Sequence, residues 1–218
     1  MSAERPPEDV TARARIRDVA LALFAERGVA GTSLRGVAAA AGVSTGLVQH
    51  HFGSKDGLRQ ACDDFAIGTL MEYAQRAMAG EGRRPDFAAA MYATSELSTR
   101  YLARALVDRS SAAAALFDAG AALAETWLSA QWPERFPPGS ARVRDAAAAM
   151  GAMHLGTMVL HEHVSRRMGV NVLDRGHARR VAVGIVDVYA AISTFLDSPD
   201  GADLRSAVDK TGEEPGDE

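Results

Sequence analysis

Apolar residues recur every three or four positions along most of the chain, a spacing that predicts helices. In the N-terminal third, we expect helical segments at residues 11–27, 32–41, 45–52 and 55–79. The first of these segments has one apolar stripe, made of Ile16, Val19, Ala20, Leu23 and Phe24. No stretch sustains the apolar/polar alternation of a half-buried strand, so the sequence predicts an all-α fold.

The segment from Thr32 to Lys55 predicts two short helices joined by a tight turn. Gly42 suits the left-handed residue that ends the first helix, and Ser44 suits the N-cap of the second. In the second helix Val48 and Phe52 lie four residues apart and point inward, which leaves Gln49 facing outward. This is the pattern of a helix-turn-helix, whose second helix enters the major groove of DNA.

The rest of the chain predicts further helices separated by loops rich in Gly and Pro. We expect a helix that begins after Asp86 and two long helices near the C-terminus, at residues 140–168 and 175–196. Between them the pattern favours shorter helical pieces at residues 110–117 and 119–131. The proline-containing residues 1–9 predict a disordered arm, and residues 198–218 predict a disordered acidic tail.

Composition narrows the class of protein. The net charge is −4, yet basic side chains outnumber acidic ones between residues 10 and 60, so a local patch can still face phosphates. The chain has a single cysteine, Cys62, which excludes an internal disulfide. No signal peptide or membrane span is apparent, and we expect a soluble cytoplasmic protein without a membrane partner.

The order G-V-S-x-G-x-(apolar)-x-x-H-F-x-S-K over Gly42–Lys55 closely resembles the DNA-binding domain of the TetR (tetracycline-repressor) family. The upstream residues RIRDVALALFAERGVAGTSLRGVA also resemble that family's first helix and the start of its second. Gln49 stands where most members carry a tyrosine. The resemblance implies a helix-turn-helix domain at residues 10–55 and a larger helical domain at residues 56–197 that binds a ligand and dimerises.

Contacts with double-stranded operator DNA are expected from both helices of the motif. The family pattern implies backbone contacts, and the outward face of the second helix offers base readers such as Gln49, which can pair with adenine. For Thr32 and Ser33 simple N-capping is the alternative, and for His51 a partly buried neutral ring. The full candidate set is Thr32, Ser33, Arg35, Ser44, Thr45, Gly46, Leu47, Gln49, His50, His51 and Lys55.

The resemblance further implies a homodimer with a small-molecule cavity among the C-terminal helices. Candidate cavity residues are Phe65, Met71, Met91, Trp127, Met150 and His154, although apolar residues on helices are more often ordinary core. Candidate dimer-interface residues are Gly151, Leu155, Met158, Val181, Ile185, Val188 and Ile192. The last two long helices would pack across a two-fold axis.

Enzymatic signals are weak throughout. His161 and His163 diverge on a helix, His154 is a full two turns from His161, and Cys62 has no motif of a catalytic thiol. We therefore expect no catalytic residues, no metal site and no cofactor. The favoured function is a repressor that a ligand releases from its operator; the alternative is an effector-independent activator or architectural protein, and an enzyme is the weakest class.

Overall fold

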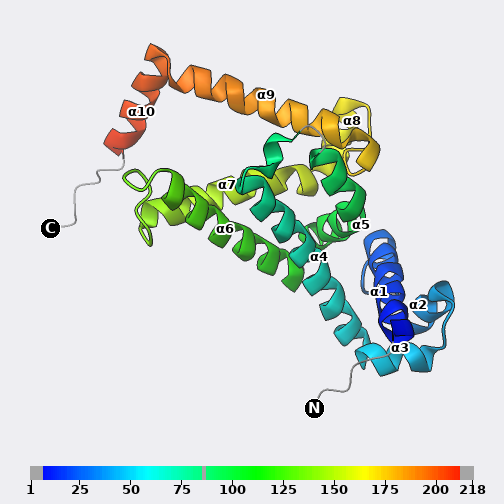
Figure 1. The fold of residues 1–218 in the computed structure, drawn as a ribbon. Coiled ribbons are helices and arrows are strands. Elements are labelled where there is room, and N and C mark those ends of the chain that lie inside the picture. Colours follow the sequence, from blue (N-terminus) through cyan, green and yellow to red (C-terminus); the bar gives the residue numbers. More distant parts are fainter. Residues whose placement is uncertain (1–6, 85–86, 212–218) are drawn as a thin grey trace.

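The computed structural model describes residues 7–84 and 87–211, and every regular element within these ranges is helical (Figure 1). The all-α prediction is confirmed for this part of the chain. The elements are α1 (Pro7–Arg27), α2 (Leu34–Ala41), α3 (Thr45–Phe52), α4 (Lys55–Met78), η1 (Glu81–Arg83), α5 (Phe87–Val107), α6 (Ser111–Gln131), α7 (Ala141–Val159), α8 (His161–Met168), η2 (Arg175–His177), α9 (Ala178–Leu196) and α10 (Pro199–Thr211).

Helices α1, α2 and α3 form one end of the molecule, and α4 leads from them into the larger helical part (Figure 1). The largest core is continuous across both parts. It contains Ile16 and Phe24 from α1, Val48 from α3, and Leu102 and Leu116 from α5 and α6, each at most 1% exposed. Helix α4 contributes Leu58, Cys62 and Ala66 to this core, so its packing is shared by both parts.

A second, smaller core lies between α6 and α7. It consists of Ala124, Leu128, Val143 and Ala147, with Trp127 and Met150 packed against it. Ser140 caps α7 as the pattern indicates, because its hydroxyl accepts a hydrogen bond from the Val143 N–H at 3.2 Å. These two helices therefore form a hairpin that extends away from α1–α3.

The ends of the chain contain more helix than predicted. Helix α1 begins at Pro7, four residues before the predicted start at Thr11. Residues 199–211, which were predicted to belong to a disordered tail, form α10. Proline at the first helical position favours a helix start in both cases, and in α10 the Ser198 hydroxyl accepts from the Gly201 N–H. Residues 1–6 and 212–218, which complete the predicted arm and tail, lie outside the described residues, as does Asp86.

Two predicted boundaries in the second half are wrong. The two pieces expected at 110–117 and 119–131 are one helix, α6, because alanine dominates this stretch and Gly120 alone does not break it. The single helix expected at 140–168 is broken at Leu160, between α7 and α8. There the Thr157 hydroxyl donates a hydrogen bond to the His154 carbonyl, and the His161 Nδ1–H donates one to the Met158 carbonyl. These side chains compete with the backbone N–H groups that would bind the same carbonyls in a regular helix.

A polar network lies under the junction between the N-terminal helices and the larger part. The Asp63 carboxylate of α4 accepts hydrogen bonds from the Tyr101 hydroxyl of α5 and from the Arg59 guanidinium, the latter at 2.6 Å. Arg59 also donates to the Ser111 hydroxyl at the start of α6 at 3.0 Å. The network therefore ties α4, α5 and α6 together at one point.

Asp63 gives the first testable prediction. Burial raises the pKa of its carboxyl above the ordinary value of 3.8, although Tyr101 and Arg59 oppose the shift. A raised folded-state pKa means that the stabilising contribution is complete below that ordinary value and is lost as the pH rises through the folded-state pKa. We expect the free energy of unfolding of wild type to fall relative to that of Asp63→Asn as the pH rises above 3.8, measured by urea unfolding. Parallel pH profiles of the two proteins would contradict this expectation.

Candidate nucleic-acid interface and cavity

The helix-turn-helix is fixed by local capping. Ser33, Ser44 and Ser54 each accept a hydrogen bond from a backbone N–H in the first turn of the next helix, all at 3.1 Å, at the starts of α2, α3 and α4. Gly42 ends α2 with φ +67°, and its N–H and that of Val43 bond the last carbonyls of α2. The prediction of Gly42 and Ser44 as turn residues is confirmed.

Helix α3 is anchored by its inner face and presents its outer face to solvent. Val48 is 0% exposed and Phe52 is 9% exposed, whereas Gly46, Gln49 and His50 are exposed. Thr45 and Leu47 are half-buried at the edges of this face. A short helix with a fixed buried side and a free polar side is the arrangement that a recognition helix needs.

Thr32 and His51 are more buried than the candidate set supposed. The Thr32 hydroxyl donates toward the Gly28 and Leu23 carbonyls, and the side chain is only 5% exposed. The expectation that Thr32 contacts DNA is therefore corrected, and Ser33 is the N-cap of the pair. His51 is half-buried, with its ring centroid 6.1 Å from that of Phe52.

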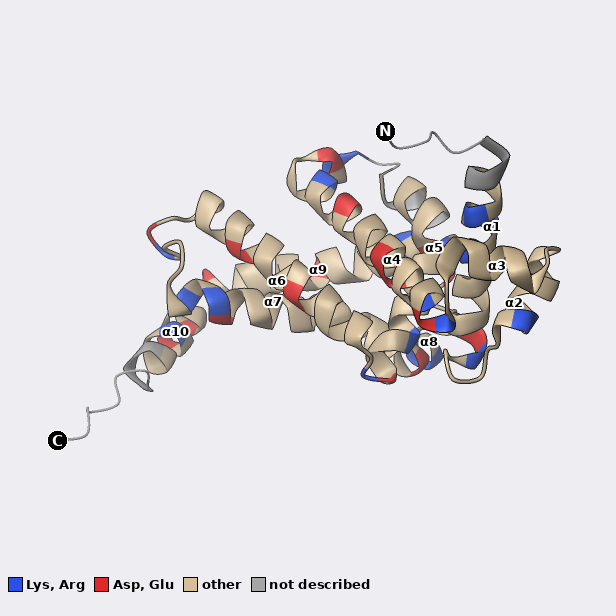
Figure 2. Ribbon diagram, turned by 90° about the horizontal axis from the view of Figure 1, so that it is seen from below, with Lys and Arg blue, Asp and Glu red and all other residues tan. Residues whose placement is uncertain are grey.

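Basic side chains of α1, α2 and α4 flank α3. Arg35 is exposed on α2, and Lys55 begins α4, where its Nζ donates to the Ala30 carbonyl at 3.5 Å. Arg13 and Arg17 of α1 lie over aromatic rings, with guanidinium carbons 5.1 Å from the Phe52 centroid and 3.4 Å from the Phe65 centroid respectively. Figure 2 shows basic positions on α1 and α2 at the end of the molecule that carries α3.

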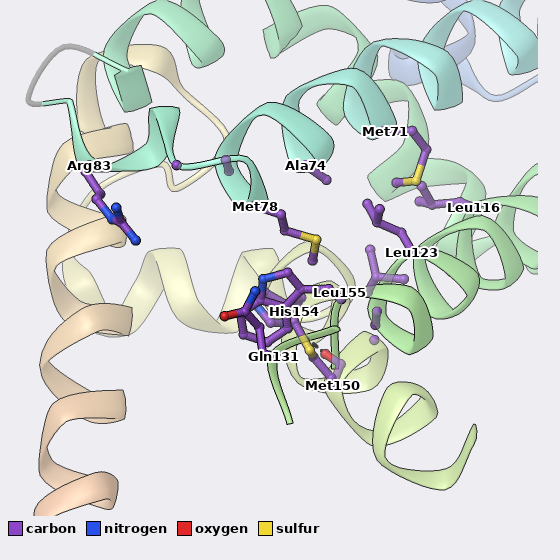
Figure 3. A pocket seen from close by; sticks show the side chains of 16 residues that line it. Met71, Ala74, Met78, Arg83, Leu116, Leu123, Gln131, Met150, His154 and Leu155 are labelled. Atoms are coloured by element: carbon purple, nitrogen blue, oxygen red, sulfur yellow. Dashed lines mark hydrogen bonds between the residues drawn. The ribbon is translucent and has the colours of Figure 1, made fainter. Parts of the chain in front are cut away.

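A cavity of about 530 Å³ lies among α4, α6 and α7 (Figure 3). Four of the six residues expected to line a cavity do so: Met71, Trp127, Met150 and His154. The other two do not. Phe65 instead supports Arg17 on the surface of α4, and Met91 of α5 is not among the lining residues. Phe65 points away because it lies on the side of α4 that faces α1.

The expected dimer-interface residues separate into several environments. Gly151 and Leu155 of α7 line the cavity, Met158 packs on the main core, and Val181 is 6% exposed because the start of α9 packs against α5. Val181 is thus buried within the chain, which corrects its assignment to a dimer interface, whereas Gly151, Leu155 and Met158 are half-buried and their part in an interface stays a prediction. Ile185 is half-buried, while Val188 and Ile192 are 57% and 41% exposed.

Helix α9 has further exposed apolar side chains that the sequence pattern did not single out. They are Val183, Val186 and Phe195, and they are joined by Tyr189, which the pattern places on one stripe with Val188 and which is exposed as well. A heptad-like stripe drawn through Val181 misses the first three, because the register of burial is set by the contact with α5 and not by periodicity alone. We call the exposed side chains of Val183, Val186, Val188, Tyr189, Ile192 and Phe195 the α9 apolar surface. Single exposed apolar residues are common on protein surfaces, but a group of this size on one helix indicates an interaction site.

A second, larger opening of about 760 Å³ lies among α1, α5 and the α7–α8 junction. Its wall combines apolar side chains with several charged ones, among them Glu26, Arg100, Arg104 and Glu162. Arg100 and Arg104 already pair with Glu96 and Asp108 at 2.9 and 2.8 Å. This crevice is therefore chemically distinct from the apolar cavity.

Other kinds of site find no support in the described part of the chain. No group of three His, Cys, Asp or Glu residues there is placed to hold a metal ion. Cys62 is buried, and burial raises the pKa of its thiol to about 12, so it stays protonated. No single helix of residues 7–84 and 87–211 has the length and apolarity to cross a membrane; α9 and α10 meet the criterion only as a pair bent by 84°.

Comparison with known proteins adds to this geometry. Residues 16–62 match the family described as "Bacterial regulatory proteins, tetR family". The chain is 61% identical over 57 residues to the transcriptional regulatory protein RaaS of Mycobacterium tuberculosis, a match that spans 26% of each chain. It is 43% identical over 58 residues to the transcriptional repressor KstR2 of Rhodococcus jostii, spanning 24% of this chain and 28% of that one.

A third relative, the transcriptional regulator BetI of Paraburkholderia xenovorans, is 41% identical over 64 residues, 29% of this chain and 33% of its own. The matches thus span about a quarter to a third of these relatives' lengths. A solved structure from work on the control of antibiotic production by bacterial hormones aligns with 82% of this chain and 95% of its own, at a TM-score of 0.50 and 24% identity. That likeness concerns the fold.

Proposed function

We propose that the chain, which residues 16–62 place in the TetR family of bacterial regulatory proteins, is a dimeric transcriptional repressor that a small molecule releases from its operator. The family is one of transcriptional regulators and not of enzymes. The observation that carries the proposal is α4, a single helix that begins beside the recognition helix at Lys55 and ends at the cavity at Met78.

DNA binding by α3 is supported by its exposed polar face and by the basic groups around it. Gln49 is exposed at the centre of this face, and Gly46 leaves room for close approach to the bases. Ser33 and Lys55 lie at helix starts, where free N–H groups and the helix dipole attract phosphate. Arg13 and Arg17, held over aromatic rings, add positive charge on the α1 side of α3, and Arg17 shares its charge with Asp18 at 2.7 Å.

Dimerisation through the α9 apolar surface is supported by the exposure of its large side chains. Val186, Val188 and Phe195 are 62%, 57% and 46% exposed in the single chain. A second copy packed across a two-fold axis would cover them and place two recognition helices on successive half-sites. Val188, Ile192 and the half-buried Ile185 belong to this proposal as first expected, whereas the buried Val181 does not.

Mapping of binding sites across the genome of the source organism tests the proposal. The expected result is one or a few sites with two-fold symmetry, whose half-sites lie about one helical turn apart. Purified protein should then bind such a site and release it on addition of a cell extract that contains the ligand. Binding that no small molecule reverses would favour the effector-independent activator or architectural class.

The exposed position of Gln49 and the helix-start position of Lys55 predict different mutant phenotypes. Gln49→Ala should change sequence preference, at a cost of about 1–3 kcal/mol for one base pair, because a bidentate base contact is lost. Lys55→Ala should weaken binding to every sequence and lower the salt slope by about one. Binding to a randomised operator over several salt concentrations measures both, with Gln75→Ala, an exposed glutamine near the far end of α4, as control. An unchanged preference in Gln49→Ala would remove it from the base-reading set.

A further inference from the structure

We propose that the cavity among α4, α6 and α7 selects a single-chain amphiphile with an acidic head group. The role of this ligand in regulation rests on the proposed function, whereas binding of the amphiphile to the cavity can be measured without DNA. Its basis is the separation of apolar and polar side chains along the cavity, together with the sign of the charges that line it.

The inner end of the cavity is apolar. Met71, Leu116 and Leu123 lie together there, while His154 and Gln131 lie apart from them, beside Met150 and Leu155 (Figure 3). Methionine side chains adapt their shape to flexible apolar groups, and Met71, Met78 and Met150 all contribute to the wall. A volume of about 530 Å³ falls in the range of cavities that enclose small organic ligands, so an aliphatic chain of moderate length fits inside.

The outer end is polar and offers hydrogen-bond donors. Arg83 and Gln131 line it and are exposed. The His154 Nδ1–H donates to the Met150 carbonyl at 2.7 Å, which leaves Nε2 for a ligand; it donates to an acidic group when it carries a proton. These three polar side chains come from η1, α6 and α7, and all of them line the same cavity.

The charge balance at this end favours an anion over a cation. No Asp or Glu is among the described lining residues, and Arg83 is the permanently charged one. The nearest acid in sequence, Glu81, is engaged by Arg76 at 2.8 Å. A cationic head group would therefore meet Arg83 without a compensating carboxylate, whereas a carboxylate would gain an ion pair there.

Calorimetric titration of the full chain with dodecanoate, dodecanol and dodecylammonium, each below its aggregation threshold, tests the inference. The three probes share one alkyl chain and differ only in the head group. We expect dodecanoate to bind about two- to fivefold more tightly than dodecanol, as for a solvent-exposed ion pair, and dodecylammonium to bind most weakly. Equal affinities, a preference for the ammonium probe, or no binding would overturn the proposal.

Variants locate the binding. Arg83→Gln should remove the preference for the acid, while Arg84→Gln, the adjacent arginine outside the lining, should keep it. Gly120→Leu should fill the cavity and abolish binding of all three probes, because no atom lies within 4 Å of a Cβ at this helical position. Gly68→Leu, equally open but outside the cavity, is its control. If Arg100→Gln lost binding of the probes while Gly120→Leu kept it, the ligand would bind in the second crevice, and the assignment to this cavity would be overturned.

Operator release by dodecanoate, measured on the same preparations, separates the two proposals. The expected binding order without release supports the ligand class and contradicts the repressor mechanism. Release by alkyl ligands that bind in another order supports the mechanism and overturns the ligand class.

Discussion

The substitution Val188→Arg is expected to leave the chain folded, make it monomeric and abolish tight operator binding. Val188 is 57% exposed on α9, so the single chain accommodates an arginine at no cost in packing. In the proposed dimer the same side chain would be buried without a partner charge, which costs about 3–5 kcal/mol and lowers the association constant more than a hundredfold. A monomer reaches only one half-site, so operator affinity falls with it.

Sedimentation at micromolar concentration and operator titration measure the two effects of Val188→Arg. The control is Val107→Arg on α5, where a valine of similar exposure, 51%, lies off α9. This variant should stay dimeric and bind the operator normally. A wild-type monomer at micromolar concentration, or a Val188→Arg protein that remains dimeric, would refute the proposed interface.

The second large effect concerns coupling between cavity and operator. Ligand binding should weaken operator binding about 5–150-fold, the usual range of allosteric coupling, and operator DNA should weaken ligand binding by the same factor. Met71 lies on α4 and lines the cavity, so Met71→Ala should reduce this factor while leaving operator affinity of the free protein unchanged. The expected cause is lost contact between ligand and α4, the helix that begins at Lys55.

Phe65→Ala is the matched comparison on the same helix. Phe65 supports the Arg17 guanidinium, 3.4 Å from its ring centroid, and does not line the cavity. Its truncation should weaken operator binding and leave the ligand affinity of the free protein as in wild type. Thermal melts guard against a trivial explanation, because truncation of a core side chain costs about 2–5 kcal/mol. If both variants lose stability, operator binding and ligand binding in equal measure, α4 is only a packing element.

The sequence predicts best the features that short-range chemistry determines. Ser44 and Gly42 specify their cap and turn through their own backbone neighbours, and Val48 and Phe52 specify the buried side of α3 by spacing alone. The missed start of α10 had a local signal of the same kind. Ser198, Pro199 and Asp200 form a typical helix beginning, which the acidic composition of the following residues obscured.

Features that depend on packing between distant helices are not readable from periodicity. Gly151 and Leu155 have the same spacing whether they face a cavity or a partner, and only the position of α6 decides between the two. Thr32 has the sequence context of a cap, yet its hydroxyl turns inward to the carbonyls of Leu23 and Gly28. The break at Leu160 likewise depends on which side chains bond the local carbonyls.

The position of the two tryptophans has a practical consequence. The chain contains only Trp127 and Trp132, and their rings meet edge-on, with centroids 5.2 Å apart. Trp127 lines the cavity and Trp132 is half exposed beside it. All indole emission and its quenching therefore originate at the cavity rim, while α3 is optically silent at these wavelengths. The protein thus carries its own label-free optical reporter, and a change in its spectrum can be read as an event at the cavity even when DNA is present.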